Sequence, residues 1–136
     1  MENTVSKSSN DHSNGLVEIF EDKKIIRVKR AMIDHSYFED VSATNMKIID
    51  ANLSDLEIKG AQLGGAYIHS IGMPPKGHPA YNPNAKQRPL KFEDCELSDS
   101  TFINCNLSNV SISDCNLNGM KINGILVEDL LRSYKQ

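Results

Sequence analysis

The amino-acid sequence predicts an all-β solenoid, in which short strands and corners alternate so that the chain coils around a narrow apolar axis. Three observations favour this fold class. Apolar residues recur every five positions, a second set of mostly apolar residues lies two positions earlier, and turn-forming residues lie two positions later. The chain has 136 residues, which suits one domain with its own core.

The apolar period covers residues 31–73 and 90–127. If the third residue of each five-residue unit is called its centre, all seventeen centres are apolar, and fifteen of the seventeen residues two positions before a centre are also apolar. A helix advances about 100° per residue, so a five-residue period would spread apolar residues around it. On a strand, residues two apart point the same way, and each unit therefore predicts a short strand with two inward side chains.

The second residue after each centre is predicted to turn a corner. Asp, Asn, Gly or Ser occupies fourteen of fifteen such positions, and these residue types tolerate turn geometry or bond their own backbone. The predicted corners are His35, Asp40, Asn45, Asp50, Asp55, Gly60, Gly65, Ser70, Asp94, Asp99, Asn104, Asn109, Asp114, Gly119 and Gly124. Four corners close one coil of twenty residues, so the units make about four coils with strands roughly 4.8 Å apart.

The units have a recognisable consensus of the form A/C-D/N-L-x-x. It is seen in ANLSD (51–55), AQLGG (61–65), CELSD (95–99) and CNLSN (105–109). This pattern resembles the pentapeptide-repeat family, and the resemblance implies a right-handed quadrilateral β-helix. The family also includes proteins that resemble duplex DNA in shape and charge, bind DNA gyrase and protect it from quinolone-type inhibitors.

Both ends of the solenoid need covers. Residues 1–15 are polar and are predicted to be a disordered tail, while apolar alternation in 16–30 predicts a strand or hairpin over the first coil. Residues 128–136 are predicted to form a capping helix, because Val127, Leu130, Leu131 and Tyr134 share one helical face. That face either covers the last coil or pairs two copies in a dimer, and the two roles are compatible.

Residues 74–89 interrupt the repeats and contain all five prolines of the chain. Proline cannot donate to a strand ladder, so this segment is predicted to leave the wall as a loop. It is cationic, whereas the repeats are acidic. Loops on rigid scaffolds commonly carry function. We therefore expect a partner-binding loop with contacts from His78, Tyr81, Lys86 and Arg88; the alternative is an inert insertion.

No catalytic motif is found, so the protein is predicted not to be an enzyme and to need no cofactor or metal. The corner aspartates Asp50, Asp55, Asp94 and Asp99 could bind Ca²⁺ between coils, although turn formation explains them more simply. The three cysteines, Cys95, Cys105 and Cys115, occupy positions that alanine fills elsewhere. They are predicted to pack inward as small apolar residues, although a disulfide is geometrically allowed.

The function predicted from these features is a protein-interaction scaffold with an unidentified protein partner, and a homodimer is an open alternative. Gyrase or topoisomerase binding by DNA mimicry is the other candidate. The net charge of −3 argues against direct binding to nucleic acid. The chain has no apolar run long enough for a membrane span and no apolar leader segment, so the protein is expected to be cytoplasmic without a membrane role.

Overall fold

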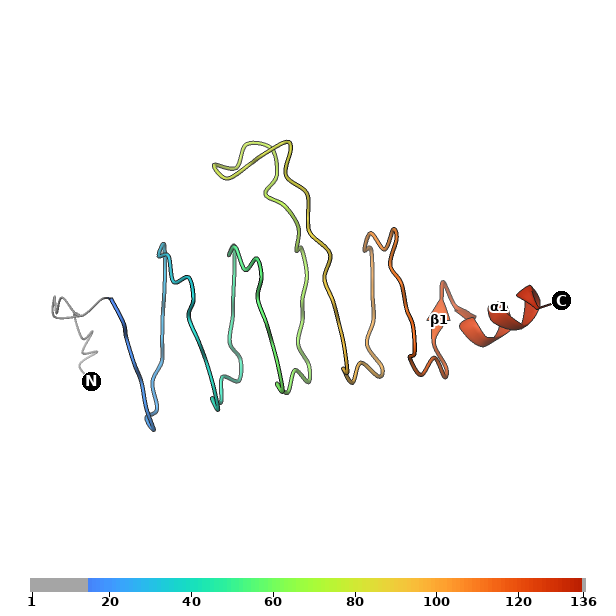
Figure 1. Cartoon of the computed structure of the whole chain (residues 1–136), viewed down its shortest axis with the longest axis horizontal. Helices are drawn as coiled ribbons and strands as arrows, with labels where there is room; N and C mark the ends of the chain where they lie inside the picture. Colours follow the sequence, from blue (N-terminus) through green and yellow to red (C-terminus); the bar gives the residue numbers. More distant parts are fainter. Residues whose placement is uncertain (1–14, 136) are drawn as a thin grey trace. The chain divides into compact units, whose positions relative to one another are not determined.

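The computed structural model describes residues 15–135, and the predicted tail at 1–15 therefore lies outside the described residues except for Gly15. The described chain divides into two units, residues 15–62 and 63–135, which are considered separately (Figure 1). The regular elements lie in the second unit. They are strand β1 (Lys121–Ile122), strand β2 (Ile125–Leu126) and helix α1 (Val127–Tyr134).

The backbone confirms the predicted corners in both units. All fifteen corner residues have a positive φ, between 50° and 83°. This left-handed conformation is disfavoured for most L-residues and is tolerated best by glycine, asparagine and aspartate. The sequence therefore places permissive residues where the chain bends, and the bends recur every five residues (Figure 1).

The corners alternate between two kinds, so the backbone repeats every ten residues. In one kind, the carbonyl of the centre accepts a hydrogen bond of 2.8–3.2 Å from the N–H three residues later. These centres are Ile33, Ala43, Leu53, Leu63, Leu97, Leu107 and Leu117. In the described residues, the corners between them lack this bond.

Side chains reinforce four of these seven hydrogen-bonded corners. The side chains of Asn52, Glu96, Asn106 and Asn116, each just before a centre, accept a bond of 3.0–3.1 Å from the N–H just after that centre. An acceptor side chain that bonds the backbone two residues on stabilises a turn. At these four corners the sequence has Asn or Glu before leucine and Ser or Asn after it.

The predicted strand or hairpin at 16–30 is not seen in the structure, which assigns no strand to those described residues. Glu21 and Arg30 have positive φ and bend the segment. Its polar contacts are local: Asp22 pairs with Lys24 at 2.7 Å and accepts a bond from the Lys23 N–H at 2.7 Å. Lys24 lowers the pKa of Asp22. Apolar alternation favours a strand only where a second strand supplies backbone partners.

The predicted buried axis and inter-coil ladder are likewise not seen. Leu107, a typical centre, is 52% exposed, and Val127, at 8%, is the buried apolar residue of the described chain. The corners and the ladder differ in range. A corner depends on one φ angle and one bond across three residues, whereas a ladder joins residues about twenty positions apart and carries a loop-closure entropy. The structure contains the local part of the repeat without the long-range part.

The last repeat positions form a hairpin. Lys121 pairs with Leu126 and Ile122 with Ile125 in antiparallel register. The linking residues Asn123 and Gly124 have φ of 49° and 83°, as in a type I′ turn. The five-residue period predicts a single corner here, at Gly124. Because Asn123 also has a positive φ, the chain reverses its direction and forms a hairpin turn. Val127 follows directly, and its N–H donates to the Met120 carbonyl at 3.0 Å.

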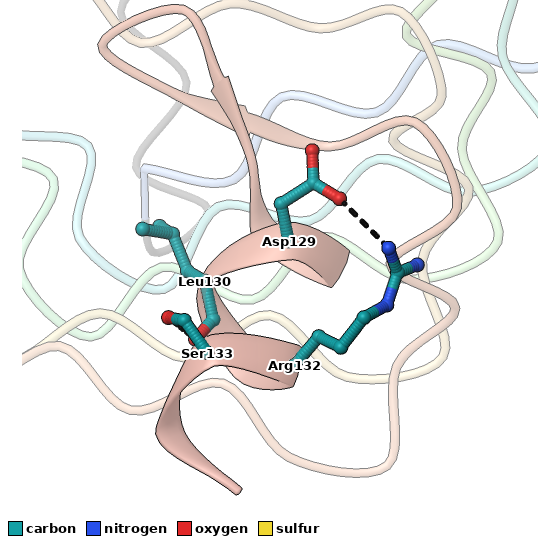
Figure 2. Close-up of polar contacts among 4 residues, drawn as sticks. All are labelled: Asp129, Leu130, Arg132 and Ser133. Carbon is teal, nitrogen blue, oxygen red and sulfur yellow. Dashed lines mark hydrogen bonds and ion pairs between the residues drawn. The ribbon is translucent and has the colours of Figure 1, made fainter. Parts of the chain in front are cut away.

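Helix α1 agrees with the helix predicted from the apolar spacing and begins one residue earlier than expected. Glu128 and Asp129 lie in its first turn and Arg132 in its last, an order that suits the helix dipole. Asp129 and Arg132 form an ion pair of 3.3 Å, and the Ser133 hydroxyl donates to the Leu130 carbonyl at 2.8 Å (Figure 2). Within the described residues, no helix is long and apolar enough to cross a membrane.

Candidate binding loop

The segment at 74–89 leaves the repeat register as a loop made of three consecutive turns. The N–H of His78 donates to the Pro75 carbonyl at 3.0 Å, that of Tyr81 to the His78 carbonyl at 2.9 Å, and that of Ala85 to the Asn82 carbonyl at 3.2 Å. Figure 1 shows this yellow-green segment standing away from the repeats that flank it in its own unit. The loop is therefore built from defined turns.

The second and third turns share one local design. Pro79 and Pro83 occupy the first central position, where a fixed φ suits a β-turn. The residue before each proline then closes the turn with its side chain. The Asn82 Oδ1 accepts from the Asn84 N–H at 2.9 Å, and the His78 Nδ1 accepts from the Ala80 N–H at 3.0 Å. This role of His78 is structural and was not predicted from the sequence.

The four predicted contact residues lie in two places on the loop. His78 and Tyr81 are the two ends of the second turn, and Tyr81 is 42% exposed. Lys86 and Arg88 follow the third turn and are both exposed. The Gln87 side chain donates to the Arg88 carbonyl at 3.2 Å. Lys76, also exposed, is the first central residue of the first turn.

Charge separates the loop from the repeats around it. Residues 74–89 contain Lys76, Lys86 and Arg88 and no acid, whereas residues 92–123 contain five acids and one base. Lys91 lies just beyond the loop but forms an ion pair with Glu93. This contact raises the pKa of Lys91 and offsets its charge. The excess of bases over acids in residues 74–93 thus comes from the loop sequence itself.

Residues on either side of a centre form a second group of exposed contacts that sequence reasoning missed. Tyr67 and His69 stack with ring centroids 4.2 Å apart and an interplanar angle of 18°. Glu39 similarly bonds Tyr37 and raises the pKa of the Tyr37 hydroxyl. Because residues two apart on a strand share a face, the five-residue register could have predicted these pairs. They are local, and each joins two residues of one unit.

The predicted C-terminal contact residues lie along helix α1. Val127, the first residue of the apolar face, is buried, whereas Leu130, Leu131 and Tyr134 are 39%, 53% and 90% exposed. Leu117, Met120 and Leu126 are half-buried in the same unit. The structure thus covers only the start of the helical face.

The three cysteines are exposed and free, so the structure does not show the predicted inward packing. Their thiols donate to the carbonyl two residues earlier, at 3.2 Å for Cys95, 3.4 Å for Cys105 and 3.2 Å for Cys115. The physical reason is the same as for the leucine centres, because the inward positions are covered only if coils stack. Among residues 15–135, no group of three or more His, Cys, Asp or Glu side chains could hold a metal ion.

The periodic corners define a five-residue repeat protein, and comparison with known families agrees. Residues 91–125 match the family described as Pentapeptide repeats, in eight copies. The resemblance to the pentapeptide-repeat family is therefore confirmed over residues 91–125. Residues 31–70 have the same five-residue period and the same corner geometry. Comparison with curated proteins and with solved structures finds no match.

Proposed function

We propose that this protein is a non-enzymatic scaffold whose repeats stack into a right-handed quadrilateral solenoid of about four coils and whose loop at 74–89 binds a protein partner. The observation that carries the proposal is the loop. Three defined turns interrupt a regular backbone and present positive charge between acidic repeats. A loop held in one shape loses less conformational entropy on binding than a flexible one.

The alternation of corners supports stacking. Hydrogen-bonded corners follow every second centre, and Met73 comes next in this alternation after Leu63. The loop begins directly after Met73, so it takes the place of one hydrogen-bonded corner. Phe92 then resumes the pattern as a centre of the other kind. In a four-sided coil, corners of one kind therefore lie above one another, and stacking would remove half-exposed leucine and isoleucine side chains from water.

The structure suggests a clean test of the loop. In a loopless variant, Ser-Asp replaces residues 74–89, because this pair follows both Leu53 and Leu97. The replacement restores a five-residue step from Met73 to Phe92. We expect the variant to keep the circular dichroism spectrum and melting temperature of the natural chain but to lose its partner in pull-down experiments. Unchanged capture by the folded variant would exclude the loop as the binding element.

Gyrase or topoisomerase binding by DNA mimicry is a second candidate, favoured by the acidic repeats. Residues 31–73 carry six acids and two bases, and residues 92–123 carry five acids and one base. Duplex DNA carries one charge per roughly 1.7 Å, so a four-coil tower of roughly 20 Å would need about 12 negative charges to match it. The repeats have fewer, which makes this the weaker candidate. Binding to purified gyrase, together with supercoiling assays with and without a quinolone, tests it directly.

The exposed face of helix α1 gives the same scaffold a second surface. Leu130, Leu131 and Tyr134 form either the cover of the last coil or a contact between two copies in a homodimer. Sedimentation of the natural chain and of Leu131→Glu separates these roles. If the natural chain is a dimer and Leu131→Glu is a folded monomer, the helical face pairs two copies. If the natural chain is a monomer and Leu131→Glu lowers its melting temperature, the face covers the last coil.

A further inference from the structure

The loop presents its cations at positions that its turns define. Lys76 is the first central residue of the turn Pro75–His78, and Gly77 beside it has a φ of 94°, which a second central position of a type II turn requires. Lys86 follows directly after the third turn, which the Asn82 side chain also closes. Hydrogen bonds thus hold the turn that contains Lys76 and the turn that ends directly before Lys86.

The lysines in and next to the loop differ in their surroundings. Lys91 is paired with Glu93 and belongs to the repeats, whereas residues 74–89 include no acid that could neutralise Lys76 or Lys86. In the unit that contains the loop, the repeats at 92–123 carry five acids and one base. An anionic ligand is therefore attracted by the loop and repelled by these repeats.

Resting on the proposed function, we infer that the loop binds a short acidic segment of a partner protein, rich in Asp and Glu, with Lys76 and Lys86 as its principal cationic contacts. A segment of a few residues can place its carboxylates against these two lysines and leave the acidic repeats untouched. A nucleic acid strand carries its charge continuously and would extend over the repeats, where like charges repel it. The pattern of charge thus favours an acidic peptide over a nucleic acid.

The test uses the full chain and a fluorescein-labelled decaglutamate peptide, with binding measured by fluorescence anisotropy at low ionic strength. The double variant Lys76→Gln/Lys86→Gln removes both charges at nearly constant size, and Lys91→Gln is the matched control. We expect the double variant to bind about tenfold more weakly, since each exposed ion pair contributes up to about fivefold in affinity. Lys91→Gln is expected to bind as the natural chain does, and added salt is expected to weaken binding.

Each other outcome overturns the inference. Equal affinity of the double variant and Lys91→Gln would show that these lysines do not select the ligand. Tighter, lysine-dependent binding of a labelled oligothymidine would assign the loop to nucleic acid. Absence of decaglutamate binding, combined with partner capture that still requires the loop, would refute the acidic segment while leaving the proposed function intact. Single variants at Lys76 and Lys86 provide the same comparison if the double variant is misfolded.

Discussion

Substitution of one corner residue tests the backbone argument most specifically. Asn109 has a φ of 61° and lies in the corner closed by the bond from the Val110 N–H to the Leu107 carbonyl at 3.2 Å. A residue with a Cβ is less favourable in this conformation by about 1–2 kcal/mol, because the Cβ approaches the following carbonyl. Glycine avoids that contact, and asparagine offsets part of its cost because its short polar side chain can hydrogen-bond locally. Asn109→Ala should therefore be less stable than the natural chain and less stable than Asn109→Gly, the second difference being about 1–2 kcal/mol.

Equilibrium urea unfolding followed by circular dichroism measures both changes. Thr101→Ala is a suitable control, because Thr101 is exposed and has no positive φ, and its substitution should change stability by less than about 0.5 kcal/mol. The reasoning fails if Asn109→Ala is as stable as the natural chain. It also fails if Asn109→Gly is as unstable as Asn109→Ala, since the loss would then come from the side chain and not from the backbone conformation.

Three further predictions concern single side chains. The Ser98 hydroxyl and N–H donate to the Glu96 carboxylate and lower its pKa. These bonds should stabilise the fold at pH values above the usual glutamate pKa, and the effect should be lost as the pH falls through the lowered pKa. An NMR titration should show a higher Glu96 pKa in Ser98→Ala, and an unchanged pKa would contradict this role of Ser98. His78→Asn should retain the turn at 78–81, because Asn82 closes the next turn with the same kind of side-chain bond. His78→Ala should lose the protection of the Ala80 amide in hydrogen exchange. Equal protection of this amide in both variants would exclude the role of the His78 Nδ1. In stacked coils, iodoacetamide should label the native thiols slowly and the urea-unfolded thiols quickly, and fast native labelling would argue against stacking at Cys95, Cys105 and Cys115.

The corners could be predicted from the sequence because they depend on local chemistry. One permissive residue, such as Asp99 or Gly65, is sufficient to set a positive φ. Four of the seven hydrogen-bonded corners also had a signal in the sequence. Asn106 before Leu107 and Ser108 after it form one hydrogen-bonded motif, but the apolar period alone does not distinguish it from neighbouring units.

The C-terminal hairpin shows how a strong repeat can hide a second signal. Asn-Gly between apolar residues is a well-known signal for a two-residue hairpin, and Asn123–Gly124 lies between Ile122 and Ile125. The five-residue register nevertheless assigned Gly124 to one more corner. The two interpretations differ by a single φ angle at Asn123, which the period does not determine.

In the candidate site, the sequence predicted which residues lie in the loop but not what they do there. Proline positions explain the turns, but His78, which is predicted to contact a partner, also accepts a hydrogen bond from the Ala80 N–H that the sequence did not indicate. Lys91 lies two residues beyond the loop and adds a positive charge in the sequence, whereas in the structure Glu93 pairs with it. Both differences arise from side-chain contacts over two residues, which composition and charge counts do not resolve.

Backbone hydrogen exchange across residues 31–70 tests most directly whether the coils stack. In residues 31–70 the corners engage the amides of Ser36, Met46, Leu56 and Ala66 through backbone bonds and that of Ser54 through the Asn52 side chain. If coils stack through an inter-coil ladder, amides in the strand parts of the units, such as 51–53 and 61–63, should also exchange slowly. Slow exchange in these strand parts is the predicted result. Slow exchange confined to these corner amides would contradict the stacked solenoid.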